Sequence, residues 1–242
     1  GAGEYELAVV FRALAPELAA RRPRPRWKTA LVDHQNLRWF RTSLHGRIPA
    51  WTPPLPAVGP WRSVNLERID GPGLHNVVVV GFLANDVPRL RFSARAEGVP
   101  PGEGACLVVA GVHLPVIVGP EGMLAAEGDV PGAALWWPHT HGAPALHPVV
   151  LELREGRQLA VGAAAFRSVS LLDEAGRPAF TVNDRPVFAR GAVWHVDDVR
   201  AVDGAPGHAT ALVAMARDAG ANLLRLGGTG TWASNSKHFV FM

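Results

Sequence analysis

The sequence predicts a mainly β protein that carries one βαβ unit near its C-terminus. Many short apolar or alternating runs are separated by turn residues, and the 242 residues include 26 glycines and 21 prolines. Such spacing is typical of strands joined by turns. One segment, roughly 209–219, has the apolar period of a helix, and a short apolar run follows it directly.

Length and composition favour a globular protein of one to three domains. Hydrophobic residues make up 48% of the chain and charged residues 19%, which is a folding rather than a disordered composition. The single cysteine, Cys106, excludes an intrachain disulfide and favours a cytoplasmic location. The longest apolar runs, near 77–84 and 107–118, fall short of the roughly 18 residues that a membrane helix needs. We therefore expect no membrane partner and no signal peptide.

Residues 1–70 carry 11 basic and 6 acidic groups, with tryptophans between them. A basic segment with interleaved aromatic residues is one way to bind nucleic acid. An excess of +5 over 70 residues is small for that purpose, so we expect arginines on a β surface and no nucleic-acid partner. Within this segment, 5–13 and 61–66 are predicted strands, whereas the prolines of 21–26 and 48–56 exclude regular structure there.

The middle of the chain predicts a small antiparallel β-sandwich. Residues 89–96 alternate between polar and apolar, as a strand with one solvated face does. The other predicted strands of this region are 76–83, 105–110, 112–118 and 148–153.

Hairpin strands and then the βαβ unit follow. Residues 166–172, 178–182 and 186–190 are predicted strands, with turns at 173–176 and 183–184. The helix carries its apolar face on Leu212, Met215, Ala216 and Ala219, stops at Gly220, and leads into a strand over 222–226. A single βαβ unit cannot cover both faces of a parallel sheet, so it either leans on the sandwich or belongs to a larger α/β domain.

Polar residues at the carboxyl ends of the two βαβ strands are candidates for ligand binding. Trp194 and His195 lie near the end of the first strand and Arg225 near the end of the second, and this edge binds ligands in α/β folds. The alternative is that Trp194 belongs to the core and Arg225 is a salt-bridge partner. Asp197 and Asp198 are adjacent and point apart, which argues against a paired-carboxylate mechanism. The pair His139 and His141 has strand spacing, but no carboxylate follows it, so we expect no metal and no cofactor.

One set of residues is colinear with a known family over about 90 positions. The set comprises Leu135-Trp136-Trp137-Pro138, Gly142, Leu146, Gly162, Phe166-Arg167, Phe180, Asn183, Pro186-Val187-Phe188, Arg190-Gly191-Ala192, Trp194 and 217–225. It resembles glycoside hydrolase family 2 in its β-mannosidase-like branch. Residues 59–64 also resemble the end of that family's N-terminal jelly roll.

The resemblance implies three parts for this chain. Residues 1–70 would be the C-terminal part of a sugar-binding jelly roll, and 74–168 an immunoglobulin-like β-sandwich. Residues 169–242 would be the truncated start of a (β/α)8 barrel, a fold that needs about 250 residues. The tail 231–242 departs from the acidic helix that the family has at this point.

The resemblance further implies a retaining exo-glycosidase that hydrolyses terminal β-mannosides, with a carbohydrate as partner. Its two catalytic glutamates lie on later barrel strands, so no catalytic residue is assigned and the chain alone is expected to be inactive. The implied substrate-binding residues are Arg225, Trp194, Asp197 and Trp51. Other members of the family cleave β-galactosides and β-glucuronides. The alternative is a non-catalytic carbohydrate-binding or scaffolding β-sandwich protein, and the sequence leaves the oligomeric state open.

Overall fold

The computed structural model divides the chain into two compact units, each considered by itself. The sandwich unit comprises residues 66–190 with 220–222 and 241–242, and the terminal unit comprises 1–65, 191–219 and 223–240. The structure describes residues 6–23, 26–42, 44, 46–49, 54–55, 58–60, 64, 73–99, 102, 104–174, 177–194, 207–226 and 239–241.

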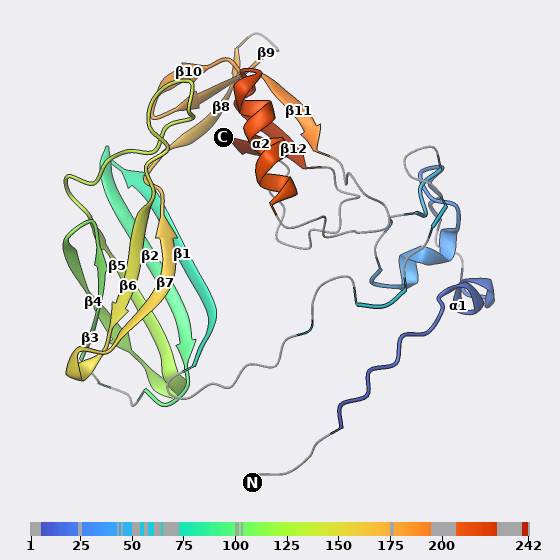
Figure 1. Ribbon diagram of the computed structural model, residues 1–242, viewed down its shortest axis with the longest axis horizontal. Helices are drawn as coiled ribbons and strands as arrows, with labels where there is room; N and C mark the ends of the chain where they lie inside the picture. The colour runs from blue at the N-terminus through green and yellow to red at the C-terminus, as the bar shows by residue number, and fades with distance from the viewer. Residues whose placement is uncertain are drawn as a thin grey trace. The chain divides into compact units, whose positions relative to one another are not determined.

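Seven antiparallel strands form the sandwich (Figure 1), in the order β1-β2-β5-β4-β3-β6-β7. Strand β4 pairs with β3 through residues 112–116 and with β5 through 117–118, so it passes from one layer to the other. This arrangement is that of an immunoglobulin-like sandwich and confirms the predicted fold class. The strands are β1 (Leu74–Ala84), β2 (Val87–Ala96), β3 (Ala105–Val109), β4 (Val112–Val118), β5 (Met123–Asp129), β6 (His147–Glu152) and β7 (Gln158–Ala164).

The core of the sandwich lies between the two layers. In β2 the alternation predicted from the sequence is confirmed, because Leu90 and Phe92 are buried while Arg91 is exposed. Phe166 follows β7 and is fully buried in the same cluster. Burial of these side chains is the main source of the unit's stability. Other fully buried members are Leu107, Leu124, Val130, Val149 and Leu151.

Two strands of the sandwich, β5 and β7, were not predicted, because their residues have low β propensity. Strand β5 contains alanine, glutamate, glycine and aspartate, and β7 is rich in alanine. Strand β5 nevertheless lies between β2 and β4, with Leu124 fully buried. Pairing on both sides and burial of alternate residues therefore outweigh the weak local preference.

Cys106 lies in β3 with its Sγ 3.7 Å from Oε2 of Glu152. Burial, and then the negative charge of Glu152, raise the pKa of the Cys106 thiol. The thiolate is the reactive form, so iodoacetamide at pH 8 is expected to alkylate Cys106 more slowly than a cysteine in an unstructured peptide. Glu152→Gln removes the charge and is expected to speed alkylation, measured by mass spectrometry. Glu97→Gln, a change at an exposed carboxylate, is the matched control. An unchanged rate in Glu152→Gln would exclude a role for that carboxylate.

Two hairpins follow the sandwich, formed by β8 (Val169–Glu174), β9 (Arg177–Val182) and β10 (Arg185–Val187). The predicted turn at 183–184 is confirmed, and both residues have the positive φ that a tight hairpin turn requires. Strand β8 extends to Glu174, so the turn predicted over 173–176 is wrong for residues 173–174, and residues 175–176 lie outside the described residues.

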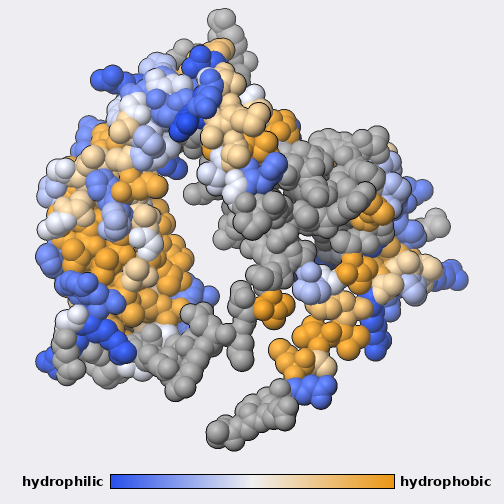
Figure 2. All heavy atoms as spheres, in the orientation of Figure 1, coloured by the Kyte–Doolittle hydropathy of each residue, from blue (hydrophilic) through white to orange (hydrophobic). Residues whose placement is uncertain are grey.

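The described residues of the N-terminal segment contain two short helices, α1 (Ala15–Ala19) and the 3-10 helix η1 (Gln35–Trp39). The strand predicted over 5–13 is wrong for residues 6–13, which form no strand. Leu7 and Val10 are 80% and 78% exposed, and the segment is visibly apolar in Figure 2. A strand needs a backbone partner, and these residues have none in the described chain. Of the strand predicted over 61–66, only Val64 is described, and it is exposed.

The βαβ unit is confirmed: β11 (Gly191–Trp194) and β12 (Leu223–Leu226) pair in parallel, with α2 (His208–Asp218) between them in the chain. A third strand, β13 (Phe239–Phe241), extends this sheet beyond β12 and was not predicted. No residue of α2 is buried, and Met215 on its predicted apolar face is 67% exposed. Within the described residues, no helix has the length and apolar character of a membrane span.

Candidate functional site

Trp194 and Arg225 lie at the same edge of the parallel pair β11 and β12. Val193 is the register partner of Arg225, and Trp194 is the partner of Leu226. The two predicted side chains are therefore brought to neighbouring strand ends, one residue apart in register. This edge holds the carboxyl ends of the two strands, and α/β folds place their ligand-binding residues at such an edge.

The register also places the two side chains on opposite faces of the sheet. Partners in a ladder share a face and successive residues alternate, so Arg225 shares a face with Val193, and Trp194 lies on the other face. Arg225 is exposed, Val193 is 54% exposed and Trp194 is partly buried. Because the sheet separates its two faces, a single ligand can contact both the Arg225 and the Trp194 side chains only beyond the ends of the two strands.

The chemistry available at this edge is that of recognition. A guanidinium donates hydrogen bonds in a planar fork and does not release its proton, so Arg225 cannot act as a general acid or base. Among the residues that the structure describes, the Arg225 side chain has no hydrogen-bond or ion-pair partner. An indole such as that of Trp194 offers an apolar face and one N–H donor.

The other two predicted site residues lie outside the described residues. Asp197 belongs to the segment after β11, and Trp51 to the proline-rich segment upstream of the sandwich. Their assignment as substrate-binding residues stays a prediction.

Asn222, directly before β12, is buried and joins three segments that are far apart in the chain. Its Oδ1 accepts a hydrogen bond from the backbone N–H of Arg190 at 2.9 Å, and its Nδ2 donates to the carbonyl of Phe188 at 3.0 Å. The same Nδ2 donates to Oγ1 of Thr140 at 3.2 Å. Arg190 directly precedes β11 and Asn222 directly precedes β12, so these hydrogen bonds join the residues at which the two strands begin. We call these contacts the joint around Asn222.

The loop that follows β5 supports this joint. His139, singled out for its spacing to His141, has its Nε2 2.8 Å from the carbonyl of Ala221. Asn183 donates from Nδ2 to the carbonyl of Trp136 and accepts from the N–H of Ser168. These contacts explain why asparagine is needed at 183 and 222, since one amide can serve a donor and an acceptor at once.

Aromatic stacking completes the joint. The guanidinium of Arg167 lies 4.2 Å from the ring centroid of the buried Trp136. Burial lowers the pKa of Arg167, although a guanidinium in this setting remains charged. Gly142 approaches the Trp137 side chain so closely that an added Cβ would lie about 3 Å from it. Several of the residues that resemble the glycosidase family therefore contact one another here.

Solved structures of three enzymes share the fold of this chain. A β-D-mannosidase from Dictyoglomus thermophilum is 23% identical, with a TM-score of 0.61, over 74% of this chain and 24% of that chain. For a β-glucuronidase from Bacteroides uniformis the identity is 19% and the TM-score 0.53, over 69% of this chain and 21% of that one. An exo-chitosanase from Amycolatopsis orientalis is 17% identical with a TM-score of 0.50, over 65% and 20% of the two chains.

The chain thus spans about a quarter or less of the length of these three structures. No family model and no curated protein sequence matches it. At these identities the likeness establishes the fold, and the activity is a separate question.

One further cavity was not predicted from the sequence. It is lined by residues between Leu18 and Arg38, in the segment that had been interpreted as an arginine-decorated surface. The signal in the sequence was the alternation of basic residues with Trp27, but nothing in it showed that hydrogen bonds would bring the two ends of the segment together.

Proposed function

We propose that this chain is part of a family 2 glycoside hydrolase whose complete form releases terminal β-mannosides. The observation that carries the proposal is the fold shared with a β-D-mannosidase over 74% of this chain at a TM-score of 0.61. The β-glucuronidase and exo-chitosanase structures match less of the chain, with lower scores. All three proteins act on glycosides, which supports a carbohydrate as the partner.

The joint around Asn222 is a second line of support. Phe188, Arg190 and Asn222 belong to the set that resembles the family, and hydrogen bonds join them in the structure. Trp136, of the same set, accepts a hydrogen bond from Asn183. A chance resemblance in sequence gives no reason for these residues to contact one another.

In the proposed reaction, a carboxylic acid protonates the leaving oxygen while a carboxylate about 5 to 5.5 Å away attacks the anomeric carbon. Water then releases the sugar with retention of configuration. We place both carboxylates outside this chain. Arg225 would donate hydrogen bonds to the sugar, and Trp194 and Trp51 would contact its apolar face, with Asp197 accepting from hydroxyl groups. The 242 residues alone are then inactive.

The first experiment assays the purified chain and the product of the uninterrupted reading frame that contains it, using p-nitrophenyl glycosides. We expect no release by the 242-residue chain, and release by the complete product that is faster for the β-mannoside than for the β-galactoside or β-glucuronide. Turnover by the short chain would refute its inactivity. If the complete product cleaves only a glycoside other than the β-mannoside, the assignment of a mannoside substrate is wrong. If it cleaves none of the glycosides, the proposed glycosidase activity is wrong.

Arg225→Gln in the complete product is expected to lower kcat/KM by about tenfold, the loss of one charged hydrogen bond of about 1.4 kcal/mol to the sugar. Arg217→Gln is the matched control, because Arg217 is exposed on α2 and pairs with Asp218. An equal effect of both changes would place Arg225 outside the site.

A further inference from the structure

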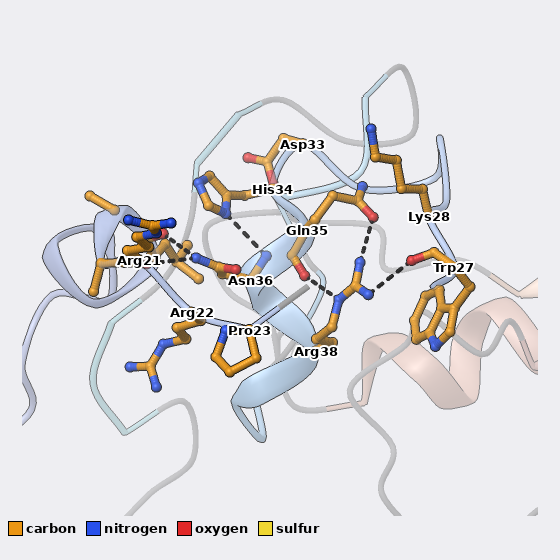
Figure 3. A pocket seen from close by; sticks show the side chains of 13 residues that line it. Arg21, Arg22, Pro23, Trp27, Lys28, Asp33, His34, Gln35, Asn36 and Arg38 are labelled. Atoms are coloured by element: carbon orange, nitrogen blue, oxygen red, sulfur yellow. Dashed lines mark hydrogen bonds between the residues drawn. The ribbon is translucent and has the colours of Figure 1, made fainter. Parts of the chain in front are cut away.

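Residues 18–23, 27–28, 33–36 and 38 of the terminal unit line an open cavity of about 440 Å³ (Figure 3). That volume lies within the range of roughly 300–1,000 Å³ that small-molecule pockets occupy. The walls come from the end of α1, the following turn, the Trp27-Lys28 pair and residues 33–38, which include most of η1. We call it the N-terminal pocket.

One wall is held rigid by Arg38. Its Nε donates to the carbonyl of Gln35 at 2.6 Å and its Nη2 to Oε1 of the same residue at 2.7 Å. Its Nη1 donates to the carbonyl of Trp27 at 2.9 Å, and the guanidinium stacks on the Trp27 ring at 4.2 Å. Figure 3 shows Arg38 between these two residues. Arg38 therefore holds the indole of Trp27 in place before a ligand binds. Less side-chain entropy is then lost when a ligand stacks on the ring.

Asn36 holds the opposite wall. Its Nδ2 donates to the carbonyls of Leu18 at 2.8 Å and Ala20 at 3.0 Å, which ties the end of α1 to η1. The backbone N–H of Asn36 donates to Nδ1 of His34 at 3.2 Å. In neutral His34 the proton therefore sits on Nε2, so the ring keeps one donor.

Several polar groups of the lining have no partner among the described residues. The side chains of Arg21, Lys28 and Asp33 form no hydrogen bond or ion pair with the described residues. The Nε of Arg22 is buried and has no acceptor among them, although its Nη2 pairs with Glu17 at 3.2 Å. A buried N–H without an acceptor is costly, which points to a ligand or water that accepts from it.

The charge and shape of the pocket indicate the class of ligand. Four cationic side chains line it against the single carboxylate of Asp33, so it favours an anion. Trp27 is 58% exposed and Arg38 covers one face of its ring, so the exposed part of the indole offers an apolar surface. We propose that the N-terminal pocket binds a single sugar ring that carries an oxyanion, such as a carboxylate, sulfate or phosphate. Asp33 then accepts from a ring hydroxyl. This inference does not depend on the proposed glycosidase activity.

The test titrates the chain with glucuronic acid, glucose 6-sulfate, glucose 6-phosphate and glucose, followed by calorimetry. We expect binding of at least one of the three anions, at least about tenfold tighter than that of glucose, and weakening as salt is raised. The ranking of the three anions identifies which oxyanion the site prefers. Equal affinity for glucose and every anion would overturn the charge assignment, and no binding at all would overturn the proposal.

Two pairs of variants assign the site. Trp27→Ala removes the stacking face, and Lys28→Gln removes one free cation; each is expected to weaken binding about tenfold. Trp39→Ala and Arg12→Gln are the matched controls, because both residues are exposed and lie outside the lining. Far-UV circular dichroism checks that each variant folds as the parent does. Equal loss in variants and controls would place binding elsewhere, and tighter binding of single-stranded RNA than of any sugar would assign the pocket to nucleic acid.

Discussion

Gly122→Ala is expected to lower the stability of the sandwich unit by about 3 kcal/mol or more. Gly122 lies in the turn between β4 and β5 with φ of +73°, where a residue with a Cβ is strained by roughly 1–2 kcal/mol. An added Cβ would also overlap the backbone carbonyl oxygen of Ala96, the last residue of β2. Backbone cannot move aside as a flexible side chain does, and overpacking adds about 1–3 kcal/mol.

The variant Gly132→Ala separates the strain of a positive φ from the overlap of the added Cβ with neighbouring atoms. Gly132 has nearly the same φ, +77°, but nothing lies within 4 Å of its would-be Cβ. We expect the loss there to be only the conformational part, roughly 1–2 kcal/mol. Urea unfolding of both variants, followed by circular dichroism, measures the difference. If the two variants lose the same free energy, the close approach of Gly122 to Ala96 is not a determinant of stability.

Asn222→Ala is expected to cost about 2–4 kcal/mol and to loosen the start of the βαβ unit. The change leaves the N–H of Arg190 and the carbonyl of Phe188 without the amide that serves them. Asn222 is 1% exposed, and an unsatisfied group in such a place costs roughly 1–3 kcal/mol. Hydrogen exchange at the Arg190 amide is expected to become faster in proportion to the loss.

Thr140→Val is the graded comparison, since it removes one acceptor of Asn222 and leaves the other two hydrogen bonds in place. We expect a smaller loss, of about 1 kcal/mol, and little change in exchange at Arg190. If Asn222→Ala changes neither stability nor exchange, the joint is held by the packing of Trp136 and its neighbours.

Strands with strong local preference were predicted well, and strands that depend on their neighbours were not. The alternation in β2 reflects the burial of one face of that strand. Strand β1 was predicted from its valines, which favour strands even though no residue of β1 is buried. Strand β5 forms because it lies between β2 and β4, which local propensity does not encode. The opposite error occurred at residues 6–13, where an apolar run lacks a partner strand among the described residues.

At the candidate site, the order of elements was predictable and the geometry was not. The helix before β12 and the positions of Trp194 and Arg225 followed from periodicity and turn residues. Their placement on opposite faces follows only from the register, in which Arg225 pairs with Val193. A shift of the pairing register by one residue would move each side chain to the opposite face of the sheet, and a single sequence does not show which register forms.

By itself, the sequence determined that the protein is mainly β with one βαβ unit, because apolar periodicity and turn residues are local properties of the chain. Only the tertiary structure decided what its polar residues do. Asn222 contacts Thr140, 82 positions away, and Asn36 contacts Leu18, 18 positions away. Hydrogen bonds over such separations form only when folding brings the segments together, so the joint and the N-terminal pocket became visible only in three dimensions.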